Sequence, residues 1–113
     1  RLAAAAALFL LPYPHLAQVS SGTLSYALAL GKAVLSAPFR HARAALAAGR
    51  GVLLPLEEEA WAQAVLALAE SPERLREMEE RAYAYARDFT WPRVARAYRR
   101  LLEEVADVRP RVA

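Results

Sequence analysis

The hydrophobic positions in the first half of the chain fall into short, uninterrupted runs. Runs of this kind are typical of strands that are covered on both faces. A proline follows each run within three residues, and the runs are 8–11, 33–35 and 52–54. Each run precedes a stretch with helical periodicity. This alternation predicts parallel strands joined by right-handed crossovers.

The first two connecting stretches carry helix signals at their ends. Apolar residues share one face from about Thr23 to Leu30, and Gly31 is suited to end that helix. A second helix is predicted over 40–48, before Gly49.

From Glu57 onward the apolar positions keep a period of about 3.6 residues, which predicts helices only. Ser71 followed by Pro72 marks one helix start, and Thr90 is suited to cap the last helix. We expect Trp61 and Trp91 to pack in the core with the apolar stripes. The stripe of the last helix is Val94, Tyr98, Leu101, Leu102 and Val105.

The predicted fold class is α/β, with a short parallel three-stranded sheet, crossover helices and a C-terminal helical segment. A chain of 113 residues has room for one such domain. Residues 1–56 form the parallel β/α part, 57–108 are helices that pack on it, and 109–113 are a frayed tail.

Composition excludes several classes of protein. With no cysteine, the chain has no disulfide framework, thiolate zinc site or cysteine nucleophile. A net charge of +3 is too small to indicate a nucleic-acid partner. The apolar run Ala3–Leu11 is shorter than the ~20 residues of a membrane span and ends at Pro12. We therefore expect a soluble, cytoplasmic protein.

The segment Ser20-Ser21-Gly22-Thr23 is the first candidate site. It joins the carboxyl end of a predicted parallel strand to the start of a helix, where open parallel sheets bind ligands. Free amides and the positive end of the helix dipole suit a phosphate group there. The alternative is an ordinary helix cap, for which serine and threonine are the usual residues.

The two histidines, His15 and His41, follow the first and second strands and are predicted at the same edge of the sheet. Without a carboxylate beside them they do not make a metal site. A surface or capping role is favoured over a substrate contact. Four arginines of the last helix have fewer acidic neighbours than those of the helix before it, and a basic face that meets an anionic partner or a membrane surface is the weaker alternative. The four arginines are Arg93, Arg96, Arg99 and Arg100.

Several stretches together resemble the C-terminal lobe of bacterial glycosyltransferases of the GT-B, "group 1" type. They are Leu-Leu-Pro-Tyr at 10–13, Ser-Ser-Gly-Thr-Leu-Ser-Tyr-Ala-Leu-Ala-Leu-Gly-Lys-Ala-Val at 20–34, Ser-Ala-Pro-Phe at 36–39, Gly-Arg-Gly-Val-Leu-Leu-Pro at 49–55 and Phe-Thr-Trp at 89–91. The resemblance implies half of a Rossmann-like lobe that holds a nucleotide-sugar donor. It further implies that Ser20, Ser21, Gly22 and Thr23 bind the donor diphosphate, with no metal or other cofactor.

The resemblance departs from the family at two positions. The family commonly has two glutamates eight residues apart, which align with Gln18 and Tyr26. These two residues and His15 are the candidates for contacts with the donor sugar or ribose. The chain is closer to a subgroup that has Ser-Ser-Gly-Thr in the loop and lacks the glutamate pair.

We therefore expect the donor-binding part of a glycosyltransferase whose acceptor is unknown and whose catalytic residues cannot be assigned. The partner implied is the N-terminal lobe of the same protein, which the resemblance does not cover, so the chain alone should be inactive. Its uncovered sheet edge predicts a dimer or higher oligomer, by sheet extension or helix exchange. The alternative is a non-catalytic α/β interaction domain that retains only the fold.

Overall fold

Within the residues that the structure describes, three strands form one parallel sheet. The computed structural model describes residues 6–17 and 20–108. The strands are β1 (Leu8–Leu11), β2 (Ala33–Ser36) and β3 (Val52–Leu53), in the order β1-β2-β3. In the register, Leu10 lies beside Leu35 and Leu35 lies beside Val52. The predicted α/β class with a parallel sheet is confirmed.

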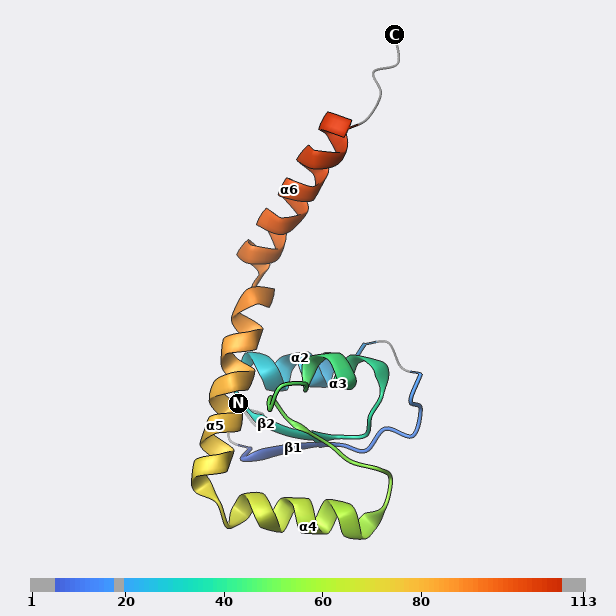
Figure 1. Cartoon of the computed structure of the whole chain (residues 1–113), viewed down its shortest axis with the longest axis vertical. Coiled ribbons are helices and arrows are strands. Elements are labelled where there is room, and N and C mark those ends of the chain that lie inside the picture. Colours follow the sequence, from blue (N-terminus) through green and yellow to red (C-terminus); the bar gives the residue numbers. More distant parts are fainter. Residues whose placement is uncertain (1–5, 18–19, 109–113) are drawn as a thin grey trace.

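Helices cover both faces of this sheet (Figure 1). One face carries α2 (Gly22–Ala29) and α3 (Arg40–Ala45), and the other carries α4 (Glu58–Ala69). The next helix, α5 (Pro72–Ala86), packs against α2, α4 and β2. Because α2 and α3 both cross over the same face, the chain advances from β1 to β3 in one direction, as right-handed crossovers require.

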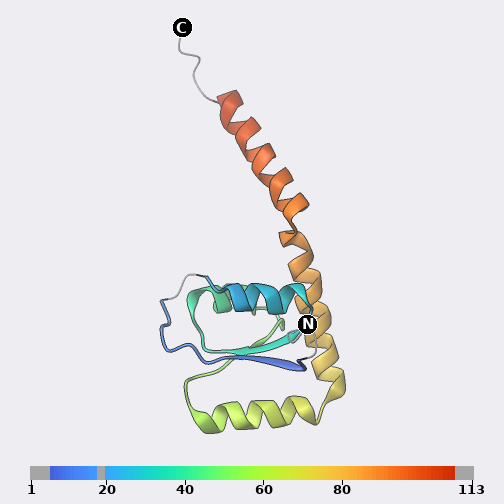
Figure 2. The ribbon, with the colours of Figure 1, turned by 180° about the vertical axis from the view of Figure 1, so that it is seen from behind.

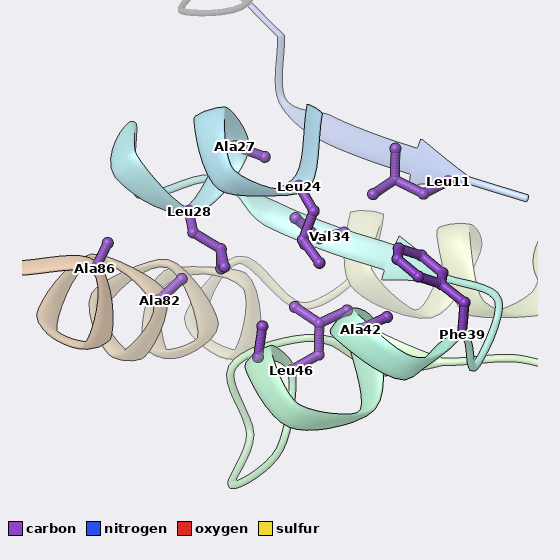
Figure 3. Close-up of a cluster of buried hydrophobic side chains, with 11 residues drawn as sticks. Leu11, Leu24, Ala27, Leu28, Val34, Phe39, Ala42, Leu46, Ala82 and Ala86 are labelled. Atoms are coloured by element: carbon purple, nitrogen blue, oxygen red, sulfur yellow. The ribbon is translucent and has the colours of Figure 1, made fainter. Parts of the chain in front are cut away.

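The core consists of two clusters, one on each side of β2, and side-chain alternation along the strand assigns its residues to them. Val34 belongs to the cluster under α2 and α3, which includes Leu24, Leu28 and Phe39 (Figure 3). Leu35 belongs to the cluster under α4, which includes Leu68 and Met78. All four residues of β2 are buried, as expected for a central strand in a three-layer arrangement.

The helix ends follow the sequence signals with one exception. Gly31 adopts φ +67° directly after α2, so its predicted role as the stop is confirmed. The second predicted helix, 40–48, is shorter in the structure and ends at Ala45. Ala48 (φ 56°) and Gly49 (φ 77°) both take left-handed backbone angles, which turn the chain back toward β3 and prevent the helix from continuing. The third strand is also one residue shorter than predicted.

The last helix lies apart from the sheet. After a 3₁₀ turn, η1 (Arg87–Phe89), α6 (Trp91–Val108) projects away from the body of the molecule (Figures 1 and 2). Residues 57–108 were expected to pack on the β/α part; in the structure α4 and α5 lie against it, whereas α6 contacts mainly η1. Neither α6 nor any other helix in the described ranges has the length and apolar composition needed to cross a bilayer.

The two tryptophans differ from the prediction to different degrees. Trp61 is half-buried against the α4-side cluster, and its indole N–H donates to the carbonyl of Pro55 at 2.8 Å. Trp91 is 87% exposed, so its predicted place in the core is wrong. Tyr98, Leu101, Leu102 and Val105, which belong to the stripe predicted for this helix, are also exposed.

A pair of leucine substitutions tests this account of the core. Leu35→Ala removes a fully buried side chain from the central strand, so it should lower the free energy of unfolding by about 2–5 kcal/mol. Leu66→Ala removes the same atoms from the exposed face of α4 and should change the free energy of unfolding by less than about 0.5 kcal/mol. Urea unfolding of both variants measures the difference, and equal effects would contradict the assignment of β2 to the centre.

Candidate functional site

Two loops meet at the carboxyl edge of the sheet. One runs from β1 to α2 and the other from β2 to α3, and parallel pairing brings them to the same edge. The backbone links them, since the Arg40 amide donates to the Leu16 carbonyl at 3.2 Å. The start of α2 and the start of α3 are therefore neighbours.

Ser21 is the residue that joins the two helix starts. It is only 4% exposed and occupies the N-cap position of α2, where its Oγ accepts a hydrogen bond from the Leu24 amide at 3.2 Å. Its own amide donates to Nδ1 of His41, on α3, at 2.9 Å. The Tyr13 hydroxyl lies 3.4 Å from Ser21 Oγ. Ser21 therefore acts as a structural cap, and its amide is already used.

The next two residues begin α2 and have a different environment. Gly22 and Thr23 are exposed, and within the described part of the chain neither amide has a hydrogen-bond partner. The first amides of a helix have no intrahelical acceptor, and the helix dipole makes this end positive. Open space surrounds Gly22, because a Cβ atom there would meet nothing within 4 Å. Of the predicted diphosphate ligands, these two offer free amides.

The other predicted residues are spread more widely. Ser20 is exposed just before the cap. Tyr26 is 72% exposed and lies one turn along α2 from Gly22. His15 is exposed in the loop after β1, and Gln18 lies outside the described residues. The structure thus brings Ser21, Gly22, Thr23 and Tyr26 together along α2.

An open pocket of about 430 Å³ runs along this helix from its first residue to its last. Its volume falls in the range of small-molecule sites. One wall is the exposed stripe of α2, His41 lies at the edge, and the opposite wall comes from α5, η1 and the start of α6. The lining residues are Gly22, Ser25, Tyr26, Leu28, Ala29, His41, Tyr85, Ala86, Phe89 and Trp91.

The sequence analysis missed the opposite wall of this pocket. Tyr85 and Phe89 pack together with ring centroids 4.8 Å apart, and Trp91 follows them. These residues lie about sixty positions after α2, and only the direction in which α5 runs brings them beside it. One signal was present, namely an unusually small stripe on α2 formed by Gly22, Ser25 and Ala29 at helical spacing.

His41 is the titratable group of this site. Desolvation by burial lowers the pKa of its imidazole from the ordinary value of 6.5. The hydrogen bond from the Ser21 amide requires Nδ1 to be an unprotonated acceptor, which favours the same neutral form. In the described residues, no group of three metal-ligating side chains gathers at this site or elsewhere.

No protein-family model, curated protein or solved structure matches this chain. The site is therefore interpreted from its own geometry and from the resemblance described above.

The interaction between His41 and Ser21 predicts a pH dependence of stability. The folded-state pKa of His41 lies below its unfolded value. Its contribution to the free energy of unfolding is therefore fully present above about pH 6.5 and is lost as the pH falls through the folded-state pKa. Unfolding of the wild-type chain should become easier over that window. His41→Asn offers a carboxamide oxygen to the Ser21 amide and should remove this part of the pH dependence.

Urea unfolding between pH 5 and 8 measures the effect, with His15→Asn as the matched control on the exposed histidine. The control should retain the wild-type dependence. An unchanged pH profile in His41→Asn would contradict the assigned interaction.

Proposed function

We propose that this chain is the nucleotide-sugar donor-binding part of a glycosyltransferase, built as half of a Rossmann-like lobe. The observation that carries the proposal is the pair of amides at Gly22 and Thr23, which have no partner among the described residues, at the end of α2 where Gly22 lines a pocket of about 430 Å³. Amides at the positive end of a helix favour a phosphate group. Their place at the carboxyl edge of a parallel sheet is where nucleotides bind in folds of this kind.

The rest of the pocket suits the remainder of such a donor. Ser25 and Tyr26 line the wall next to the amides; the Ser25 hydroxyl donates to the Ser21 carbonyl at 3.1 Å and can still accept, and the Tyr26 hydroxyl can bond sugar or ribose hydroxyls. Tyr85, Phe89 and Trp91 offer apolar ring faces on the other side. A rise of 1.5 Å per residue makes the stripe from Gly22 to Ala29 roughly 10 Å long, enough for a diphosphate and a ribose laid end to end.

Charge sets the expected strength of binding. Among the described residues that line the pocket there is no lysine or arginine, so two amides and the helix dipole face the diphosphate without a full positive charge. We expect a dissociation constant in the range of about 0.1–1 mM, which corresponds to a modest binding free energy. The proposal also places the protein in a bacterial cytoplasm, in keeping with the resemblance and with a chain that lacks cysteine.

A second function is favoured by the environment of Ser21. Its amide is bound to His41 and its hydroxyl caps α2, so it offers nothing to a phosphate. Tyr26 stands where the family commonly has a glutamate. Both features fit a non-catalytic α/β interaction domain that has kept the fold. The free amides of Gly22 and Thr23 favour the donor-binding function over it.

Calorimetric titration of the chain with UDP and with GDP separates the two functions. Donor binding predicts saturable heat with one of these nucleotides. Gly22→Val should weaken binding at least tenfold, because its branched side chain covers the amides at the helix start. The substitution has room in the fold, since nothing lies within 4 Å of the added Cβ.

Thr23→Val is the matched control, because it keeps the size of the side chain and the amide and removes only a hydroxyl. It should retain binding within about threefold, since a single neutral hydrogen bond contributes little. Equal binding by Gly22→Val and wild type would exclude the helix start as the site. No heat with either nucleotide would favour the interaction domain.

We also expect no sugar transfer by this chain alone, because the resemblance covers only the donor lobe of an enzyme that works between two lobes. A radiolabelled sugar-transfer assay checks this, and measurable turnover by the chain would contradict it.

A further inference from the structure

The exposed helix α6 has two chemically distinct halves. At 3.6 residues per turn, its large apolar residues fall within about half of its circumference. Trp91, Tyr98 and Val105 repeat at intervals of seven, and Val94 and Leu101 repeat in the same way. Tyr98 is 63% exposed, and the leucines of this half are also exposed. An apolar face of this extent on a water-exposed helix marks an interaction surface.

The polar half narrows the choice of partner. It carries four arginines against three acidic residues, so its charge is nearly balanced: Arg93, Arg96, Arg99 and Arg100 with Glu103, Glu104 and Asp107. A helix that lies on an anionic membrane has a polar face rich in lysine and arginine without such acidic neighbours. The balance favours a protein surface.

We propose that a second copy of this chain covers the apolar face, with the two α6 helices packed antiparallel about a two-fold axis between residues 98 and 99. In that arrangement each side of α6 next to its apolar face lies against the same side of α6 in the second copy. Residues at equal distances before and after the axis then lie opposite each other. Arg93 and Glu104 share one side and lie at equal distances from the axis. Arg93, which lies 2.7 Å from Asp88 in its own chain, therefore also faces Glu104 of the second copy, and this contact occurs twice in the dimer.

The opposite orientation is less favourable. In a parallel pair, Arg93 of one copy and Glu104 of the other would lie about 16 Å apart along the helix axis, so this pairing would be lost. The parallel pair would also bring both sheet bodies to the same end of the helix pair (Figure 1). In the antiparallel pair, Arg99 comes near Arg99 of the second copy. Each of these arginines already lies 3.3 Å from Glu103 of its own chain.

The area of this interface fits a dimer. The tryptophan and tyrosine rings of two copies would alone bury roughly 600–1,000 Å². The leucines and valines between them bring the interface toward the roughly 1,200–2,000 Å² of stable complexes. Because α6 projects away from the sheet, the two bodies lie at opposite ends of the helix pair without competing for space (Figure 2). The dimer is proposed independently of nucleotide binding, and Trp91 is the residue that the interface and the pocket share.

Sedimentation equilibrium between about 5 and 200 μM tests the dimer. The wild-type chain should reach twice its mass of 12.4 kDa. Tyr98→Glu places a carboxylate beside the two-fold axis and should weaken association at least tenfold. Arg96→Glu puts the same side chain on the polar half and should leave association within about threefold of wild type. Circular dichroism establishes that both variants keep the fold.

The orientation is tested separately with spin labels, because the chain has no cysteine of its own. Single-cysteine variants Arg100→Cys and Asp107→Cys place labels on the polar half, away from the interface. The antiparallel dimer predicts an inter-label distance about 10 Å longer at 107 than at 100.

Equal distances at the two sites would overturn the antiparallel arrangement. A monomer throughout the concentration range would overturn the dimer, and binding of that monomer to vesicles of phosphatidylglycerol would assign the face to a membrane. Association that Tyr98→Glu leaves unchanged would place the interface elsewhere, such as the sheet edge.

Discussion

The burial of β2 on both faces is the constraint on which the rest of the structure depends. A four-residue strand with no exposed position needs apolar cover on each side and a backbone partner on each edge. Val34 requires α2 and α3 above it, and Leu35 requires α4 below it. Parallel pairing with β1 and β3 follows, because the helices that supply the cover are also the crossovers. The loops at the carboxyl ends of β1 and β2 are thereby fixed at one edge.

The candidate site is a consequence of that edge. The hydrogen bond from Ser21 to His41 joins the starts of α2 and α3, and the Ser21 cap fixes the direction of α2. Among the residues that the structure describes, the amides of Gly22 and Thr23 are left without a hydrogen-bond partner. Trp91 belongs both to the pocket beside these amides and to the apolar face of α6, so the two surfaces proposed to bind partners adjoin each other.

Local signals in the sequence predicted the elements, whereas the placement of distant elements was not predictable from them. The apolar runs, Gly31 and the Ser71-Pro72 pair are local features, and they located the strands and several helix ends. The length of α3 was not predictable, because the alanines at 44, 45, 47 and 48 favour a helix while the chain has to turn back to β3. The aromatic wall of the pocket depends on the direction of α5. The exposure of Trp91 depends on α6 leaving the body, and periodicity identifies an apolar face without showing what covers it.

The central claim is that a diphosphate binds to the first amides of α2. The most direct measurement is a nitrogen–proton correlation NMR titration of the labelled chain with UDP and GDP, which follows each amide separately. The account predicts that the amide signals of Gly22 and Thr23 move most, and that those of the polar half of α6 stay in place. Shifts centred on another part of the chain, or no shifts at millimolar nucleotide, would contradict it.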